Sequence, residues 1–316
     1  MSSKKLGAES FEDFYAKIFS SRWGEIRSAL LRPERQVLRW NRFSKSPPDR
    51  LQDLERLTDY IFWQTESHPR GPYRGEDDLL DAYVMDPASL APAWALRVQP
   101  GNMVLDMCAA PGGKTLILAE GLLSEGHQID GQLVANDLSP DRRARLIKVL
   151  QQYIPRAQRE GRIFVTGKEG VQFGLKQPGQ FDRILLDAPC SGERHFFERA
   201  EDLQQWSLRR SEGLATRQYA LLAAAWLALK PGGRIVYSTC ALSPLENDEV
   251  VRKFIKKKKP DLVHQESDVG LTGFLAKASE RSEFGWHFLP DHSGIGPIYF
   301  AVFEKRSPLQ NEFEGD

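Results

Sequence analysis

Three cysteines give this sequence its first chemical signal. Cys108, Cys190 and Cys240 each come at the end of an apolar run that predicts a β-strand. In an open α/β sheet, ligands bind outside the carboxyl ends of the strands, so side chains there carry more functional weight than side chains elsewhere. The spacings are far from C-x-x-C and the histidines are scattered, so no metal site is expected. Three buried packing thiols are the alternative, because free cysteine behaves as a small apolar residue.

A glycine-rich turn follows the first of these strands. The sequence V-L-D-M-C-A-A-P-G-G-K-T, from Val104 to Thr115, predicts a strand, a tight turn and a helix. Gly112 and Gly113 have no Cβ, so backbone N–H groups at the start of the helix can approach a ligand closely. We assign the cofactor loop to Cys108, Ala109, Ala110, Pro111, Gly112, Gly113 and Lys114. A structural turn without a ligand is the alternative.

An acidic residue after the next strand narrows the choice of ligand. A phosphate-binding P-loop needs G-x-x-x-x-G-K-[ST], and its first glycine falls on Cys108, so that pattern fails at one essential position. Asp137 follows the turn by roughly 20 residues, at a place where a carboxylate can accept hydrogen bonds from ribose hydroxyls. A nucleoside ligand that needs no polyphosphate suits this combination. The cofactor that we predict is S-adenosylmethionine.

Two thiols, a carboxylate and a methyl-donor site together predict methylation of a pyrimidine at C5. Carbon C5 is a poor nucleophile in the resting ring, and a thiolate that adds to C6 raises the electron density on C5. Asp187, in D-A-P-C, would stabilise the electron-rich adduct from the N3 edge of the ring. A second thiol would assist release of the product. The catalytic residues that we predict are Cys240, Cys190, Asp187 and Lys114, and Asp187 and Lys114 also belong to the predicted cofactor site.

Composition limits the class of protein. The chain has 316 residues, of which 41% are hydrophobic, and this suits one large domain with a smaller appendage. Lysine plus arginine equals aspartate plus glutamate at 43 each, so any basic surface for nucleic acid must be local. No apolar run approaches the roughly 20 residues of a membrane span, and the start lacks a secretory apolar core. We therefore expect a soluble protein of the cytoplasm that has no membrane partner.

The amino-terminal part is expected to be a small, mainly helical region. Residues 1–45 place apolar side chains at intervals of three and four, which predicts short helices, and residues 46–75 contain proline and glycine that predict irregular structure. We place a boundary near Asp77. The predicted organisation is a region over residues 1–76 with a role in RNA binding, a methyltransferase domain over 77–306 and a tail over 307–316.

Strand and helix patterns alternate through the larger domain. Predicted strands cover Met103–Cys108, Gln132–Asp137, Ile163–Gly167, Arg183–Cys190 and Arg234–Cys240. Predicted helices cover Asp86–Leu96, Thr115–Leu123, Pro140–Gln152, Ser211–Ala228 and Ser243–Ile255, and Trp286–Pro290 with Pro297–Glu304 forms a closing antiparallel pair. The pattern predicts an α/β fold with a doubly wound, mostly parallel sheet of the Rossmann-like type and a terminal antiparallel hairpin.

Read in order, the motifs resemble those of the NOP/NOL/Sun-domain RNA cytosine-C5 methyltransferases. D-M-C-A-A-P-G-G-K-T is similar to the cofactor loop of that family, N-D-L-S to its ribose-contact segment, D-A-P-C to its fourth motif, and Y-S-T-C with L-E-N-D-E to its sixth. The resemblance runs from about Tyr83 to Val251, and a weaker resemblance is present at Gly296–Phe300. It implies a class I, S-adenosylmethionine-dependent enzyme in which Cys240 is the nucleophile and Cys190 aids product release.

Within that family the chain most resembles the mitochondrial ribosomal-RNA branch, through D-P-A-S-L, N-D-L-S-P-D-R-R-A-R-L and Arg194-His195. The resemblance implies RNA as the partner, ribosomal in preference to transfer RNA, and the mitochondrial matrix as the location in a eukaryote. That branch usually has aspartate near the adenine ring, and this chain has Glu169, which we assign to the cofactor site. A P-loop-like NTPase and a non-catalytic RNA-binding assembly protein remain alternatives, although binding alone needs neither Cys190 nor Cys240.

Overall fold

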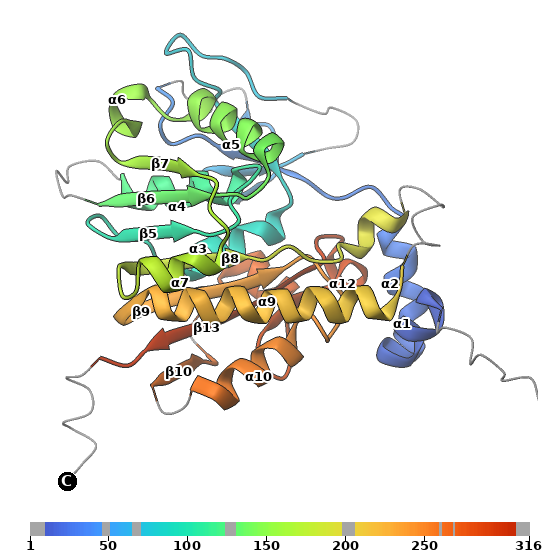
Figure 1. Ribbon diagram of the computed structural model, residues 1–316. Coiled ribbons are helices and arrows are strands. Elements are labelled where there is room, and N and C mark those ends of the chain that lie inside the picture. The colour runs from blue at the N-terminus through green and yellow to red at the C-terminus, as the bar shows by residue number, and fades with distance from the viewer. Residues whose placement is uncertain are drawn as a thin grey trace, which may run out of the picture.

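Two sheets organise the protein, which was analysed as a computed structural model (Figure 1). The structure describes residues 10–45, 51–64, 71–123, 131–197, 206–258, 261–267 and 269–307. Within these ranges, a nine-stranded sheet carries helices on both faces, and a four-stranded antiparallel sheet packs beside it. The predicted tail over residues 307–316 lies outside the described residues, except for Ser307.

The large sheet confirms the predicted α/β architecture. Its strands are β5 (Met103–Asp106), β6 (Gln132–Asn136), β7 (Ile163–Thr166), β8 (Phe181–Asp187), β9 (Leu229–Thr239), β10 (Leu262–Gln265), β11 (Glu280–Arg281), β12 (Trp286–Phe288) and β13 (Ile298–Lys305). The strands β9, β8, β5, β6 and β7 lie side by side and run parallel. Strand β13 runs antiparallel to β9 and to β12, so the closing antiparallel pair is also confirmed.

The five helices predicted for the larger domain are present, and five shorter helices in the described part of that domain were not predicted. The helices are η3 (Pro87–Ser89), α3 (Leu90–Ala95), α4 (Gly113–Leu122), α5 (Pro140–Tyr153), α6 (Arg156–Arg159), α7 (Val171–Lys176), η4 (Glu193–Phe197), α9 (Leu208–Ala228), α10 (Asp248–Lys258), α11 (Gly273–Ala278) and α12 (Pro290–Ser293). The predicted ones are η3 with α3, α4, α5, α9 and α10. Asp86 caps η3 by accepting the backbone N–H of Ala88 at 2.7 Å, as the Asp-Pro pair predicts. Among the described helices, none is both long and apolar enough to span a bilayer.

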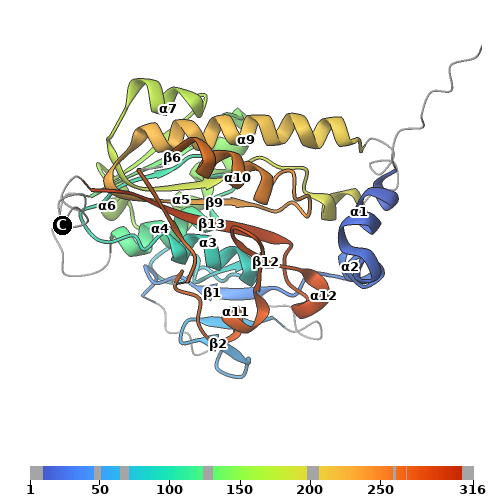
Figure 2. The same ribbon diagram turned by 90° about the horizontal axis from the view of Figure 1, so that it is seen from below.

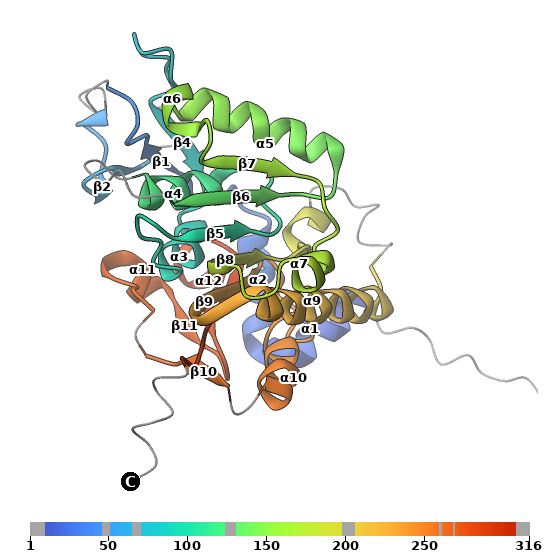
Figure 3. The same cartoon turned by 60° about the vertical axis from the view of Figure 1, so that its left-hand side comes forward.

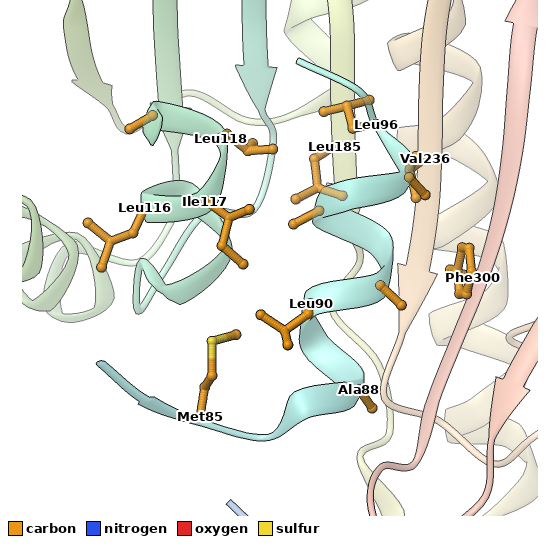
Figure 4. Packing of buried hydrophobic residues seen from close by; sticks show 14 of the residues in the cluster. Met85, Ala88, Leu90, Leu96, Leu116, Ile117, Leu118, Leu185, Val236 and Phe300 are labelled. Atoms are coloured by element: carbon orange, nitrogen blue, oxygen red, sulfur yellow. The ribbon is translucent and has the colours of Figure 1, made fainter. Parts of the chain in front are cut away.

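Alternating side chains bury both faces of the large sheet. Along β8, Ile184 and Leu186 pack with α7, α9 and α10, whereas Leu185 packs with α3 and α4 on the other face. Figure 2 shows α7, α9 and α10 on one side of the sheet and α3, α4 and the small sheet on the other. Figure 4 shows α3 between α4 and the sheet residues Leu185, Val236 and Phe300. Such two-sided burial is expected for a parallel sheet, because its crossover helices cover both faces.

The small sheet corrects the prediction of a mainly helical amino-terminal region. Helices cover Phe11–Leu30, but β1 (Val37–Trp40), β2 (Arg56–Thr58), β3 (Ile61–Trp63) and β4 (Ala82–Met85) form an antiparallel sheet in the order β2-β3-β1-β4. Strands of three or four residues give too short a pattern to recognise, and tertiary contacts stabilise them here. Strand β4 follows the predicted boundary near Asp77 and pairs with β1, which precedes it.

A buried ion pair and two hydrogen bonds attach the small sheet to the larger one. The Arg39 guanidinium of β1 lies 2.5 Å from the Glu120 carboxylate of α4, and both side chains are buried. Asn41 and Ala82 hydrogen-bond to Tyr153 at the end of α5, at 2.8 and 3.0 Å. Removing one partner of such a pair would leave an uncompensated buried charge, so loss of either Arg39 or Glu120 should be destabilising. Figure 3 shows β1 and β4 close to α4 and α5.

The amino-terminal helices lie beyond the carboxyl ends of the parallel strands (Figures 1 and 2). These helices are α1 (Phe11–Phe19), η1 (Ser20–Arg22) and α2 (Trp23–Leu30). Arg22 pairs with Glu280 of β11 and Asp291 of α12, each at 2.5 Å. Because ligands bind at the carboxyl ends of strands in such sheets, these helices border the region where a site is expected.

Candidate active site

The glycine turn between β5 and α4 brings the chain close to two neighbouring elements. Gly112 adopts φ +119°, a conformation that side chains disfavour, and a Cβ there would lie 3.0 Å from Val149 of α5. A Cβ on Gly113 would lie 2.8 Å from the ring of Tyr83 in β4. Both glycines are therefore required by packing, and the first backbone N–H groups of α4 stay accessible at the turn.

Two pockets meet at this turn, and together they contain every predicted cofactor residue except Gly112. One is lined by Tyr83, Val84, Met85, Ser89, Asp106, Cys108, Ala109, Ala110, Pro111, Gly113, Lys114 and Asp187. The other is lined by Met107, Cys108, Asn136, Asp137, Leu138, Arg142, Lys168, Glu169, Gly170, Pro189, Arg217 and Leu221. Cys108 lines both, so the two pockets adjoin at the ends of β5, β6 and β8, and we call them together the cleft.

Asp137 connects the glycine turn to the start of α5. Its carboxylate accepts the Ala110 backbone N–H at 3.3 Å and the Ser139 backbone N–H at 3.0 Å. The Arg142 guanidinium lies 3.2 Å from the same carboxylate. Asp137 is 6% exposed and faces the second pocket, so its charge is held at one wall of the cleft.

Glu169 lies in the same pocket as Asp137. The Arg217 guanidinium of α9 lies 3.6 Å from its carboxylate, and the Glu169 side chain is 38% exposed. The structure therefore places Glu169 in one pocket with Asp137, and its partly exposed carboxylate faces Arg217.

Asp187 and Lys114 form an ion pair in the first pocket. The Lys114 ammonium lies 2.8 Å from Asp187 Oδ2, and Ser238 donates its hydroxyl to Asp187 Oδ1 at 2.7 Å. Burial alone would lower the pKa of Lys114, but the charge of Asp187 and its hydrogen bond outweigh burial and raise that pKa. Lys114 is therefore a permanent cation, held beside a carboxylate whose second oxygen is fixed by Ser238.

Cys190 and Cys240 lie side by side at the ends of β8 and β9. Their sulfur atoms are 2.9 Å apart, and the backbone N–H of Cys240 donates to the Cys190 sulfur at 3.3 Å. Both thiols are free. The hydrogen bond with Cys240, followed by burial, raises the pKa of Cys190 well above its usual value. Cys190 therefore favours the protonated thiol, and either sulfur of the pair can donate to the other.

The third cysteine, Cys108, is a poor candidate for a nucleophile. Cys108 lines both pockets of the cleft, and burial raises the pKa of its thiol far above the usual range. A thiol that stays protonated is a poor nucleophile. Cys108 therefore acts as a wall of the cleft, which agrees with its place in the predicted cofactor loop.

Asn247 holds the turn that carries Cys240, and its role was not assigned from the sequence. Its side chain accepts the Thr239 hydroxyl at 2.6 Å and donates to the Ala241 carbonyl at 2.8 Å. Ala241 donates its N–H back to the Thr239 hydroxyl at 3.2 Å. The sequence motif L-E-N-D-E contains this residue, but the motif alone did not show that Asn247 holds the Cys240 turn.

Asp106 is a second residue that sequence reasoning missed. It ends β5, is 1% exposed and lines the first pocket, where Thr115 donates to its Oδ2 at 2.7 Å. Among the described residues, its Oδ1 has no hydrogen-bond partner. Burial raises the pKa of Asp106 to about 7. An unpaired, buried carboxylate oxygen is costly, so this position fits a ligand that brings a hydrogen-bond donor.

Metal chemistry has no visible support in the described ranges. No group of three or more histidine, cysteine, aspartate or glutamate side chains there is close enough to hold an ion. Of the scattered histidines, His68 and His127 lie outside the described residues, as does the side chain of His195.

Known proteins share the part of the chain that carries this loop, ion pair and pair of thiols. A family model described as 16S rRNA methyltransferase RsmB/F matches residues 93–304, about two thirds of the chain. The chain belongs to this family. The RsmB/F match includes the glycine turn, both cysteines at the strand ends and the closing antiparallel pair, whereas the amino-terminal helices and the small sheet precede it.

Relatives of this RsmB/F chain act on two kinds of RNA. It is 38% identical over 258 residues to the mouse 5-cytosine rRNA methyltransferase NSUN4, a match that covers 80% of this chain and 62% of the relative. It is 30% identical over 267 residues to the mouse mitochondrial tRNA (cytosine(34)-C(5))-methyltransferase, covering 78% and 74% of the two chains. The chain thus spans less than two thirds of the first relative.

A solved structure shares the fold of most of the chain. A methyltransferase homologue from Pyrococcus horikoshii superimposes with a TM-score of 0.73 at 25% identity, and the match covers 93% of each chain. The amino-terminal segments that the family model leaves out are thus included in the structural likeness.

Proposed function

We propose that this protein is an S-adenosylmethionine-dependent RNA methyltransferase that forms 5-methylcytosine, with ribosomal RNA as its substrate. The observation that carries the proposal is the contact between the Cys190 and Cys240 thiols at 2.9 Å, next to the Asp187–Lys114 pair. Ser238 connects the two features, because it hydrogen-bonds to Asp187 and stands two residues before Cys240. Membership of the family supports the same activity, and it supports neither an NTPase nor a non-catalytic assembly protein.

The cleft fits S-adenosylmethionine at three points. Asp137 and Glu169 would take the nucleoside end, since both face the second pocket. The unpaired Oδ1 of Asp106 lies in the first pocket and would accept a hydrogen bond from the ammonium group of the methionine end. Cys108, between the two pockets, would border the middle of the ligand. When bound, S-adenosylmethionine supplies an electrophilic methyl group on a sulfonium.

The paired thiols and the ion pair would carry out different parts of the reaction on the base. The Cys240 thiolate would add to C6 of cytosine, which moves the electron pair of the C5–C6 double bond onto C5. Lys114 donates and Asp187 accepts hydrogen bonds, so together they suit the N3 and amino groups at the edge of the ring. Once C5 has been methylated, a water molecule or a side chain acting as a base would take its proton, the C–H electron pair would restore the C5–C6 double bond, and Cys240 would leave as a thiolate. Cys190, in contact with that sulfur, is positioned to aid this release.

The substrate base must reach the ends of buried strands. A base stacked within a helix cannot do so, and the target cytosine is therefore single-stranded or flipped out of its stack. We expect the protein to work where ribosomes are assembled, which is the cytoplasm, or the mitochondrial matrix in a eukaryote. Because one relative is a transfer RNA methyltransferase, transfer RNA is the comparison substrate.

The proposal is tested by transfer of a labelled methyl group from S-adenosylmethionine to RNA transcribed in vitro. Small-subunit ribosomal RNA should acquire 5-methylcytidine, detected by nucleoside mass spectrometry and located by bisulfite sequencing. Transfer RNA and a variant that lacks both Cys190 and Cys240 are the controls. Methylation of transfer RNA alone would show that transfer RNA, and not ribosomal RNA, is the substrate. Methylated RNA from the double variant would refute the thiol chemistry.

Replacement of Asp137 by alanine should weaken S-adenosylmethionine binding by about tenfold or more. A hydrogen bond to a charged group contributes about 1.5–3 kcal/mol, and roughly 1.4 kcal/mol corresponds to a tenfold change in affinity. The substitution also removes the acceptor for the Ala110 N–H, which loosens the glycine turn. Calorimetry measures the affinity, and Asp141→Ala, an exposed change nearby at the start of helix α5, is the control. Equal affinities for Asp137→Ala and the wild type would show that the ribose lies elsewhere.

A further inference from the structure

A buried carboxylate, Glu193, lies behind the two thiols. It begins η4 and is 0% exposed. Its Oε1 accepts the Tyr15 hydroxyl at 2.5 Å and the Ser191 hydroxyl at 2.6 Å, and its Oε2 accepts the Leu242 backbone N–H at 2.9 Å. Burial of a carboxylate is costly unless several donors surround it, and here three donors do so.

These three donors come from three separate parts of the chain. Ser191 follows Cys190 directly, Leu242 stands two residues after Cys240, and Tyr15 belongs to α1. Figures 1 and 2 place α1 beyond the carboxyl ends of the parallel strands, on the side where the thiols lie. One carboxylate thus joins both cysteine-bearing loops to the amino-terminal helix.

A second buried carboxylate fixes the Cys190 loop from another direction. Glu246 is 0% exposed and accepts the Ser191 backbone N–H at 3.0 Å and the Gln218 side-chain N–H at 2.8 Å. Burial, and then the nearby charge of Glu193, raise the pKa of Glu246. Ser191 is therefore held by its side chain and its backbone at once, which leaves the Cys190 loop little freedom.

We infer that Glu193 is a positioning residue that keeps the Cys190 and Cys240 loops together, so that the two thiols stay in contact. Its carboxylate acts through Ser191 and Leu242 and does not touch substrate. Tyr15 completes its set of donors but belongs to neither cysteine-bearing loop. The consequence for methylation rests on the proposed function, whereas the placement of the thiols can be measured without it.

The amide analogue of Glu193 separates positioning from general packing. In Glu193→Gln, one amide oxygen can still accept from Tyr15 and Ser191, but the NH2 group then faces the Leu242 N–H, which is also a donor. The bond to the Cys240 loop is lost while the shape of the side chain is kept. Tyr15→Phe is the matched variant, because it removes the α1 donor and leaves both loop contacts.

The test measures how fast a mild azo oxidant, diamide, joins Cys190 to Cys240 in the folded protein. The two thiols each lose one hydrogen, the azo group gains both, and peptide mass spectrometry identifies the disulfide. Wild type and Tyr15→Phe should cross-link at rates within about twofold of each other. Glu193→Gln should be slower by about tenfold or more, because reactions between held groups are sensitive to displacements of about 1 Å. S-adenosylmethionine affinity, which depends on the other end of the cleft, should stay at the wild-type value.

Two outcomes would overturn the inference. Wild-type cross-linking in Glu193→Gln would show that the thiols stay in contact without this carboxylate, and equal slowing in Tyr15→Phe would show a general loosening. If Glu193→Gln does not fold, Glu193→Asp carries the same test, since a shorter side chain keeps the charge but cannot reach both loops. A protein that cross-links as expected but methylates no RNA would refute the proposed function and leave the positioning role intact.

Discussion

Cys240→Ala is expected to abolish methylation of RNA, with a loss of at least about three orders of magnitude in rate, as for other nucleophiles removed from an assembled site. The substitution removes the sulfur that must add to C6, so C5 is never activated. Neighbouring Cys190 is not expected to substitute, because it follows a different strand, β8, and its sulfur does not occupy the position of the missing one. Methyl transfer and covalent RNA adducts should both disappear in single-turnover assays.

Affinity for S-adenosylmethionine provides the control for Cys240→Ala. The proposed cofactor residues lie at or just after the ends of β5, β6, β7 and β8, and Cys240 lines neither pocket of the cleft. Calorimetry should therefore give wild-type binding. Methylation by this variant at a rate near that of the wild type would rule out Cys240 as the nucleophile.

Cys190→Ala is expected to trap the protein on RNA. If Cys190 serves release alone, Cys240 still attacks and C5 still receives its methyl group, but the adduct does not break down. A species that resists denaturant should appear as a shifted band on a gel and should contain one protein bound to one RNA.

The double variant of Cys190 and Cys240 is the matched control, and it should show no adduct. An adduct in Cys240→Ala with none in Cys190→Ala would show that the two thiols have exchanged roles. Normal turnover by Cys190→Ala without an adduct would show that release needs no second thiol.

The sequence by itself determined the large sheet and the cofactor turn. The parallel strands are near-continuous apolar runs because both of their faces are buried, and such runs stand out from the amphipathic helices between them. The glycine turn was equally visible, because Gly112 must adopt a conformation that other residues disfavour and Gly113 must pass close to Tyr83. These features depend on neighbours in the sequence or on burial, and both leave a local signal.

The small sheet was decided by tertiary structure. Its strands are three or four residues long, and β2 has no fully buried side chain. Such strands persist because partners far along the chain hold them, as Glu120 holds Arg39 and Tyr153 holds Asn41. Local patterns could not reveal these contacts, and helices were predicted for part of this region.

Tertiary structure also decided how the predicted site residues meet. The sequence placed Cys190 and Cys240 at strand ends, but only the parallel pairing of β8 with β9, in the register Asp187 to Ser238, brings their sulfurs into contact. Glu193 carries no sequence signal of its role, because its donors Tyr15 and Leu242 come from distant segments. Residue types identify the chemistry that a chain can perform, whereas distances between side chains depend on the packing of segments that are far apart in sequence.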